Sequence, residues 1–136
     1  MFLLDTNVIS ALRRPDRLPP EVTAWADSAD ADQFYISAIS ILEIEQSILA
    51  EKRVDPVTGE ILRAWFETDV LQAFADRIIA VDTEVAMRCA ALHVPDPQSE
   101  RDGLLAATAL VHSMTIVTRN IIDFEKTGVA LLNPWI

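Results

Sequence analysis

Three acidic residues, far apart in the sequence, stand where a carboxylate could hold a metal ion or act on a phosphate. Asp5 follows the apolar residues Met1 to Leu4 directly. An ionisable group beside a buried strand is unfavourable unless it is paired, hydrogen-bonded or bound to metal. Glu43 lies within ILEIE, and Asp102 begins the segment DGLLAATALVHS. A cluster of such acids would favour a bound divalent metal, which reverses the local charge.

Each of these acids also has an ordinary local explanation. Asp5, or its neighbours Thr6 and Asn7, can cap the helix that follows. Ser40 and Glu43 have the spacing of a capping box, which would give Glu43 a purely local role. Asp102 falls in the first turn of a helix, where the positive helix end stabilises a carboxylate.

Glu45 competes with Glu43 for a place in the cluster. At about 100° per residue, Ile41, Ile44 and Ile48 form one apolar face of the helix, and Glu45 falls within it. Glu43 points the opposite way. Periodicity by itself therefore favours Glu45 as the acid directed towards the interior.

The segment TRNIIDF adds polar side chains late in the chain. Thr118, Arg119, Asn120 and Asp123 follow a strand, and taken alone they are typical of a turn with a solvated arginine. His93 and His112 show no spacing that marks them as catalytic. The three tryptophans are scattered without basic neighbours, which is typical of core or interface positions rather than a base-stacking platform.

Short apolar runs alternate with helical patterns along the whole chain. The expected strands are 1–4, 34–37, 78–81, 115–118 and 129–132. The expected helices are 8–13, 21–28, 39–52, 55–74, a helix capped by Asp82 or Thr83, 101–113 and 121–126.

Strands that are nearly continuous apolar runs, separated by helices, indicate a parallel sheet covered on both faces. Ligands of such α/β sheets gather beyond the carboxyl ends of the strands. Asp5 follows the first strand, and Asn120 and Asp123 follow the fourth. We therefore expect these groups to meet at one edge of the sheet.

Length and composition narrow the class of protein. A chain of 136 residues and 15.1 kDa fits a single domain, residues 1–136. No apolar run is long enough for a membrane span, and the start lacks the features of a secretory signal. A single cysteine, Cys89, excludes an internal disulfide and favours a reduced, cytoplasmic setting. One Cys and two His cannot form a usual zinc site.

The net charge of −10 weighs against binding to nucleic acid over the whole surface. Acids gathered around a divalent metal would repel nucleic acid less, because the metal reverses the local charge. A negative surface also suits a basic protein partner.

Four blocks of the sequence together resemble the PIN-domain ribonucleases, and most closely the VapC-type toxins, including their FitB-like branch. The blocks occur in the family's order across essentially the whole chain. They are FLLDTNVIS, YISAISILEIE, DGLLAATALVHSMTIVTRNIIDF and VALLNPW.

The resemblance implies a three-layer α/β/α fold with a five-stranded parallel sheet. It implies RNA cleavage that depends on Mg²⁺ or Mn²⁺, with Asp5 and Asp102 as metal ligands. The spacing from Ser37 selects Glu43 as the second acid, with Glu45 as the alternative. The fourth acidic position falls in TRNIIDF, where Asn120 stands at the aligned place. Asp123 follows three residues later, and Thr118 would support the site by a hydrogen bond.

The family resemblance further implies a homodimer neutralised by an antitoxin with a basic C-terminal tail, which alone would contact operator DNA. Two other functions compete with the ribonuclease. A PIN fold with weak catalysis would act through antitoxin and DNA complexes, and the departure at Asn120 favours this alternative. A phosphatase or phosphoacceptor domain could use Asp5, but neither Lys52 nor Lys126 ends a predicted strand.

Overall fold

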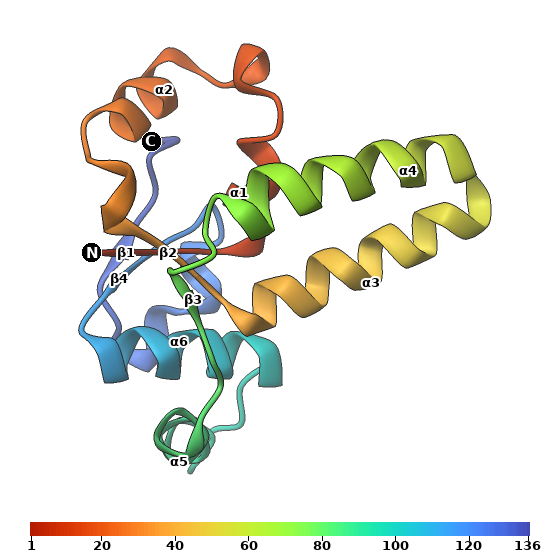
Figure 1. Ribbon diagram of the computed structural model, residues 1–136. Helices are drawn as coiled ribbons and strands as arrows, with labels where there is room; N and C mark the ends of the chain where they lie inside the picture. Colours follow the sequence, from red (N-terminus) through yellow and green to blue (C-terminus); the bar gives the residue numbers. More distant parts are fainter.

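A computed structural model describes all residues, 1–136, as a five-stranded parallel sheet between two layers of helices (Figure 1). The strand order is β3-β2-β1-β4-β5, and every neighbouring pair is parallel. The strands are β1 Phe2–Leu4, β2 Phe34–Ser37, β3 Ile78–Ile79, β4 Thr115–Val117 and β5 Leu131–Leu132. The expected α/β sheet is therefore confirmed, with β1 in its centre.

The α-helices occupy the connections between the strands. They are α1 Thr6–Ala11, α2 Pro20–Asp27, α3 Ala38–Val54, α4 Pro56–Trp65, α5 Thr83–Leu92 and α6 Glu100–His112. In Figure 1, α6 lies on one side of the strands and α1 and α2 on the other, while α3 and α4 project as a hairpin. No helix is both long and apolar enough to pass through a bilayer.

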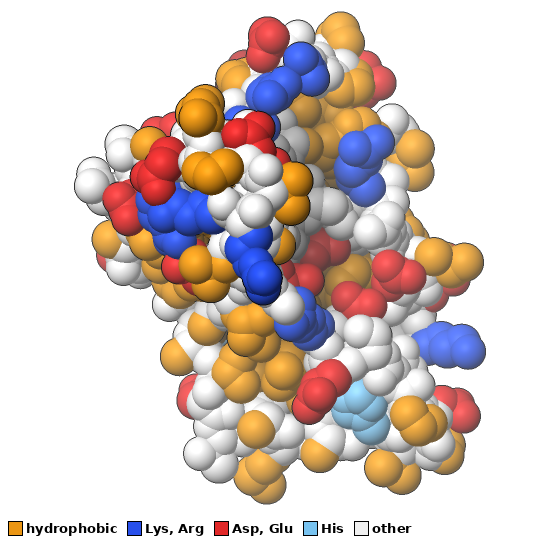
Figure 2. Space-filling model, turned by 90° about the vertical axis from the view of Figure 1, so that its right-hand side faces the viewer, with side chains coloured by type: hydrophobic (Ala, Val, Ile, Leu, Met, Phe, Trp, Pro, Cys, Tyr) orange, Lys and Arg blue, Asp and Glu red, His pale blue; other side chains and the backbone are white.

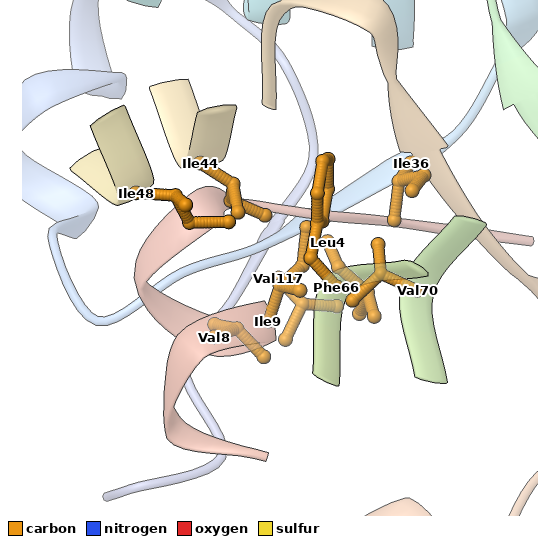
Figure 3. Close-up of a cluster of buried hydrophobic side chains, with 9 residues drawn as sticks. All are labelled: Leu4, Val8, Ile9, Ile36, Ile44, Ile48, Phe66, Val70 and Val117. Atoms are coloured by element: carbon orange, nitrogen blue, oxygen red, sulfur yellow. The ribbon is translucent and has the colours of Figure 1, made fainter. Parts of the chain in front are cut away.

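Neighbouring residues of β1 point into two different cores, as the alternation of a strand requires. Leu4 belongs to a cluster with residues of α1, α3 and the segment after α4, which Figure 3 shows together. Leu3 belongs to a second cluster with Leu105, Ala106 and Ala109 of α6. Both faces of the sheet are thus buried, which explains why the strands are apolar without alternation.

Helix caps set several boundaries that periodicity alone places wrongly. Asp5 caps α1 through the Thr6 N–H, so α1 begins at Thr6 rather than Val8. Ser37 caps α3 through the Ile39 N–H, so Ser40 lies inside the helix and the proposed capping box with Glu43 does not form. Of the two caps expected before the fifth helix, Asp82 and Thr83, the structure has Asp82, and Asp55 caps α4.

Two predicted helices differ from the structure. The helix expected from Asp55 to Phe74 is α4 followed by a π-helical segment, Phe66–Gln72. The wider π turn places both Phe66 and Val70 in the core. The short helix expected over 121–126 is two 3₁₀ turns on either side of Phe124, which is fully buried and anchors them.

Candidate active site

Asp5 is placed at the carboxyl edge of the sheet, between the ends of β1 and β4. Its backbone N–H donates to the Val117 carbonyl at 2.9 Å, which continues the parallel pairing of the two strands. The residue is only 9 % exposed. The end of a central strand therefore fixes both the position of this carboxylate and its burial.

Three donors satisfy the Asp5 carboxylate. The Thr6 N–H donates to Oδ1 at 2.8 Å, and the Thr118 hydroxyl and Asn7 Nδ2 donate to Oδ2 at 2.8 and 3.0 Å. Burial raises the pKa of Asp5 above its ordinary value, and the charge of Glu43 adds to the rise, while the three donors oppose it. The site holds a carboxylate whose charge is costly, and a cation would offset that cost.

Glu43 faces this same edge from the second turn of α3. Its Oε1 accepts a 2.8 Å hydrogen bond from the Thr6 hydroxyl, which also lies 3.0 Å from the buried Ser40 hydroxyl. The charge of Glu43 contributes to the raised pKa of Asp5. The structure thus brings Glu43 into the neighbourhood of Asp5.

Glu45 points elsewhere and is already paired. Arg63 of α4 donates to its Oε1 at 2.8 Å and also contacts Oε2, across the α3–α4 hairpin. The apolar face therefore accommodates Glu45 by supplying a cation. Periodicity could not show this partner, which lies 18 residues away in the sequence.

Asp102 enters from the first turn of α6. Burial is the largest cause of its raised pKa, followed by the charges of Asp123, Asp5 and Glu43. Those charges act on Asp102 because the four carboxylates share one region of the molecule. Asp102 is half-buried and therefore more open to solvent than Asp5.

The segment after β4 supports the site in two ways. Thr118 is fully buried, donates to Asp5, and accepts the Asn120 N–H at 2.9 Å. Asn120 itself is exposed and carries no charge. Asp123 is also exposed, and its charge is felt by Asp102. Asp123 is thus the carboxylate of this segment that adds to the acidic field.

Sequence reasoning missed three residues that contact the acids: Thr6, Asn7 and Arg101. The Arg101 guanidinium lies 3.8 Å from Glu43 Oε2 and donates to Gln46 at 2.9 Å. The pattern DTN gave a signal for Thr6 and Asn7, which directly follow the buried acid. Arg101 had no such signal beyond its position before Asp102.

The histidines lie outside the acidic cluster. His93 Nδ1 accepts the Gln98 N–H at 3.0 Å, and its Nε2 faces Gly103. The Nε2 atom of His112 is buried without a hydrogen-bond partner. Gly103 leaves room for the His93 ring and the Cys89 thiol, which accounts for a glycine inside α6.

The donor set fits Mg²⁺ or Mn²⁺ better than softer metals, since every candidate ligand is oxygen. The structure brings no three His, Cys, Asp or Glu side chains into an arrangement that would hold an ion by themselves. Mg²⁺ does not require such a cage, because it commonly binds through one or two carboxylates and keeps several waters. Asp5 and Asp102 would serve as that pair.

Figure 2 shows the side of the molecule towards which β1 runs in Figure 1. Asp and Glu side chains gather near the middle of this face, with several Lys and Arg side chains around them. A negative centre with a basic surround can accept both a cation and a phosphate chain. The net charge of −10 is therefore unevenly distributed.

A model of the PIN domain family matches residues 2–129, nearly the whole chain. The chain belongs to the PIN-domain family. This PIN domain is 37 % identical to Toxin FitB of Neisseria gonorrhoeae, over 99 % of both chains. It is 34 % identical to VapC ribonuclease Y4jK of Sinorhizobium fredii, over 99 % of this chain and 98 % of that one.

Solved structures agree with these relatives. The crystal structure of FitAcB from Neisseria gonorrhoeae superposes with a TM-score of 0.88 at 35 % identity, covering 99 % of each chain. FitAB bound to a DNA fragment gives 0.85 at 35 % identity, over 100 % of this chain and 96 % of that one. The PIN domain described above thus lies in the VapC and FitB branch of the family, as the four sequence blocks predict.

Proposed function

We propose that this PIN domain is an endoribonuclease that hydrolyses RNA phosphodiester bonds with bound Mg²⁺ or Mn²⁺. The observation that carries the proposal is that Asp5 after β1, Glu43 in the second turn of α3 and Asp102 in the first turn of α6 lie near enough for their charges to act on one another. The charges of Asp5 and Glu43 both raise the pKa of Asp102. Relatives named as a VapC ribonuclease and a FitB toxin support the same activity.

The position of each residue suggests a different role in the proposed reaction. Asp5 and Asp102 would hold the cation, and a bound Mg²⁺ or Mn²⁺ would acidify water and offset charge on the phosphate. Hydrogen bonds from Thr118, Thr6 and Asn7 favour the ionised form of Asp5 and orient its carboxylate. Glu43, whose Oε1 accepts the Thr6 hydroxyl, would orient the metal-bound water or support the attacking one. Asp123 adds negative field beside Asp102, and Asn120 stands where the family pattern has its fourth acid.

Water attack on the phosphodiester would leave a 5′-phosphate and a 3′-hydroxyl. Neither histidine is given a role, because His93 Nδ1 accepts the Gln98 N–H of the loop before α6 and His112 Nε2 is buried without a hydrogen-bond partner. The proton transfers therefore fall to carboxylates and water. His112→Ala is expected to retain most of the activity.

The decisive experiment is cleavage of RNA by the purified protein with Mg²⁺ or Mn²⁺. Asp5→Asn and Asp102→Asn should each reduce cleavage by at least about 100-fold, and EDTA should abolish it. His112→Ala serves as the control for handling and contamination. Equal cleavage by wild type and both Asn variants would show that the acids are not the site.

We further propose that the protein is the toxin of a toxin–antitoxin pair and forms a homodimer. A basic C-terminal tail of the antitoxin would suit the acidic centre, because a guanidinium can pair with two carboxylates. Contact with operator DNA would come through the antitoxin. Growth arrest on expression, relieved by Asp5→Asn, is the expected cellular result.

A PIN domain with weak catalysis is the second candidate, favoured by the uncharged Asn120 at the fourth acidic position. This alternative predicts partner binding without metal-dependent cleavage. Asn120→Asp separates the two functions: a large gain in cleavage over a nearly inactive wild type would support the binding module.

A further inference from the structure

Three arginines surround a pocket beside the acidic centre, although the chain as a whole is strongly acidic. The pocket has a volume of about 210 Å³, and its lining includes Ser10, Arg14, Arg17, Leu18, Arg119 and Trp135. None of the three arginines forms an ion pair with an acid. Asp16 lies between two of them in the sequence, but it is exposed and pairs with neither. Their charge is available to a ligand.

An arginine and a tryptophan form one wall of this pocket. The Arg119 guanidinium lies 4.8 Å from the centre of the Trp135 ring. Trp135 packs at the edge of the core, and its backbone N–H donates to Asn133 Oδ1 at 3.0 Å. An aromatic ring held in this way, with a planar cation over it, offers a stacking surface for a nucleobase.

The pocket is connected to Asp5 through the side chain of Asn7. The Arg119 N–H donates to Asn7 Oδ1 at 3.4 Å, and Asn7 Nδ2 donates to Asp5. Arg119 also directly follows Thr118, which donates to the same carboxylate. Asn7 and the pocket residue Ala11 lie four residues apart on one side of α1. The pocket therefore adjoins the residues that contact Asp5.

We propose that this pocket binds single-stranded RNA next to the phosphate that is cut, with a base against Trp135 and Arg119 and phosphates at Arg14 and Arg17. The inference rests on the proposed ribonuclease function and adds to it the place where the strand is held. It explains how a protein of charge −10 retains RNA. Guanidinium groups suit phosphate because they bind its oxygens in pairs.

The test is binding of a fluorescent single-stranded RNA of about 12 nucleotides, measured by anisotropy in EDTA over a range of salt. Arg14→Gln/Arg17→Gln should weaken binding and make the slope of log Kd against log salt shallower by about 1.4. Trp135→Leu should weaken binding about tenfold. Arg119→Gln tests the same wall without removing a core side chain.

The matched control is Arg53→Gln/Arg88→Gln, which removes two exposed arginines elsewhere and changes the net charge equally. An equal loss in control and pocket variants would overturn the proposal, because only the total charge would then matter. The proposal would also be overturned if the pocket variants bound RNA as the wild type does but no longer bound an acidic protein partner. Melting curves of each variant check that it is folded.

The test of the RNA-binding pocket can fail or succeed independently of the test of the ribonuclease activity. On a cleavable RNA, the pocket variants should raise KM with little change in kcat, as expected for uniform binding. RNA binding through the pocket without metal-dependent cleavage would refute the ribonuclease proposal but support the RNA-binding pocket. Metal-dependent cleavage with an unchanged KM in the pocket variants would support the ribonuclease but refute the pocket.

Discussion

At the scale of single residues, Asp5 caps α1 and also stands at the centre of the proposed chemistry. The two roles are compatible because different oxygens serve them: Oδ1 accepts the Thr6 N–H, and Oδ2 faces Thr118 and Asn7. The sequence allowed Asp5, Thr6 or Asn7 to be the cap of this helix. The structure instead has Asp5 as the cap, with its two neighbours as supporting donors.

Thr118→Val tests the most buried of these donors. Loss of its hydrogen bond raises the pKa of Asp5 further, so protons compete with the metal up to a higher pH. We expect the acidic limb of the pH–rate profile to move to higher pH and metal affinity to fall about 10- to 100-fold. The measurement is RNA cleavage over pH at limiting Mg²⁺.

Thr108→Val is the matched control for that substitution. Thr108 is equally buried, but its hydroxyl donates to the Leu104 carbonyl within α6. It should leave the pH–rate profile in place. The same profile in both variants would show that Thr118 does not tune Asp5.

At the scale of elements, the α3–α4 hairpin separates two glutamates that periodicity and the family resemblance ranked in opposite order. Glu43 contacts Thr6 of α1, whereas Glu45 contacts Arg63 of α4. Periodicity describes which face of a helix is apolar, but a cation from another helix can satisfy an acid on that face. The distinction depends on tertiary contacts.

Glu43→Gln and Glu45→Gln should therefore have opposite effects. The first should reduce cleavage strongly and leave the melting temperature nearly unchanged. The second should lower the melting temperature and leave cleavage nearly unchanged, because it breaks the pair with Arg63. Cleavage assays and thermal unfolding of the two variants provide the comparison. Reversed effects would make Glu45 the functional acid.

The contact between α5 and α6 yields a second prediction at this scale. A Cβ at position 103 would lie 2.9 Å from His93 Nε2 and 3.3 Å from Cys89 Sγ. Gly103→Ala should lower the free energy of unfolding by about 1–3 kcal/mol, measured in urea. The loss should shrink in a His93→Ala background, where the ring is absent.

Gly128→Ala is the control for that pair. Gly128 has a φ of 77° and open space where a methyl group would be added, so the cost of the substitution comes from backbone strain alone. His93→Ala should not relieve it. Relief at both positions would mean that His93 acts on general stability and not on packing at Gly103.

Much of the architecture was accessible from the sequence because buried parallel strands are apolar runs. All five strands occur within the predicted ranges, although β3 and β5 are shorter. The π segment after α4 was not accessible, since it depends on how Phe66 and Val70 meet the sheet. The position after a buried strand singled out Asp5 and the resemblance to PIN-domain ribonucleases singled out Asp102, whereas the pocket at Trp135 needed coordinates.

At the scale of the whole molecule, the acids oppose folding unless a cation is bound. The pKa of Asp102 is raised, so its stabilising contribution is present below its ordinary pKa and is lost as pH rises through the raised value. In EDTA at neutral pH, Asp102→Asn should therefore be more stable than wild type. The difference should shrink as pH falls through the raised pKa of Asp102 and vanish below the ordinary pKa of aspartate, about 3.9.

Mg²⁺ should reverse that order at neutral pH. A ligand that binds only the folded state stabilises it, and the wild type retains the carboxylate that holds the ion. Thermal unfolding with EDTA and with Mg²⁺, for both proteins, measures the effect. A wild type whose melting temperature is unaffected by Mg²⁺ would contradict metal binding at Asp102.

The central position of β1 has a consequence for how the protein is made. Asp5 and Thr118 are hydrogen-bonded but 113 residues apart, and β1 pairs with β4 along its full length. A ribosome must therefore release the chain through β4 before this carboxylate can find its buried partner. A nascent chain that ends before Thr118 cannot assemble the proposed cutting centre, so the proposed RNA cleavage waits until β4 has left the ribosome.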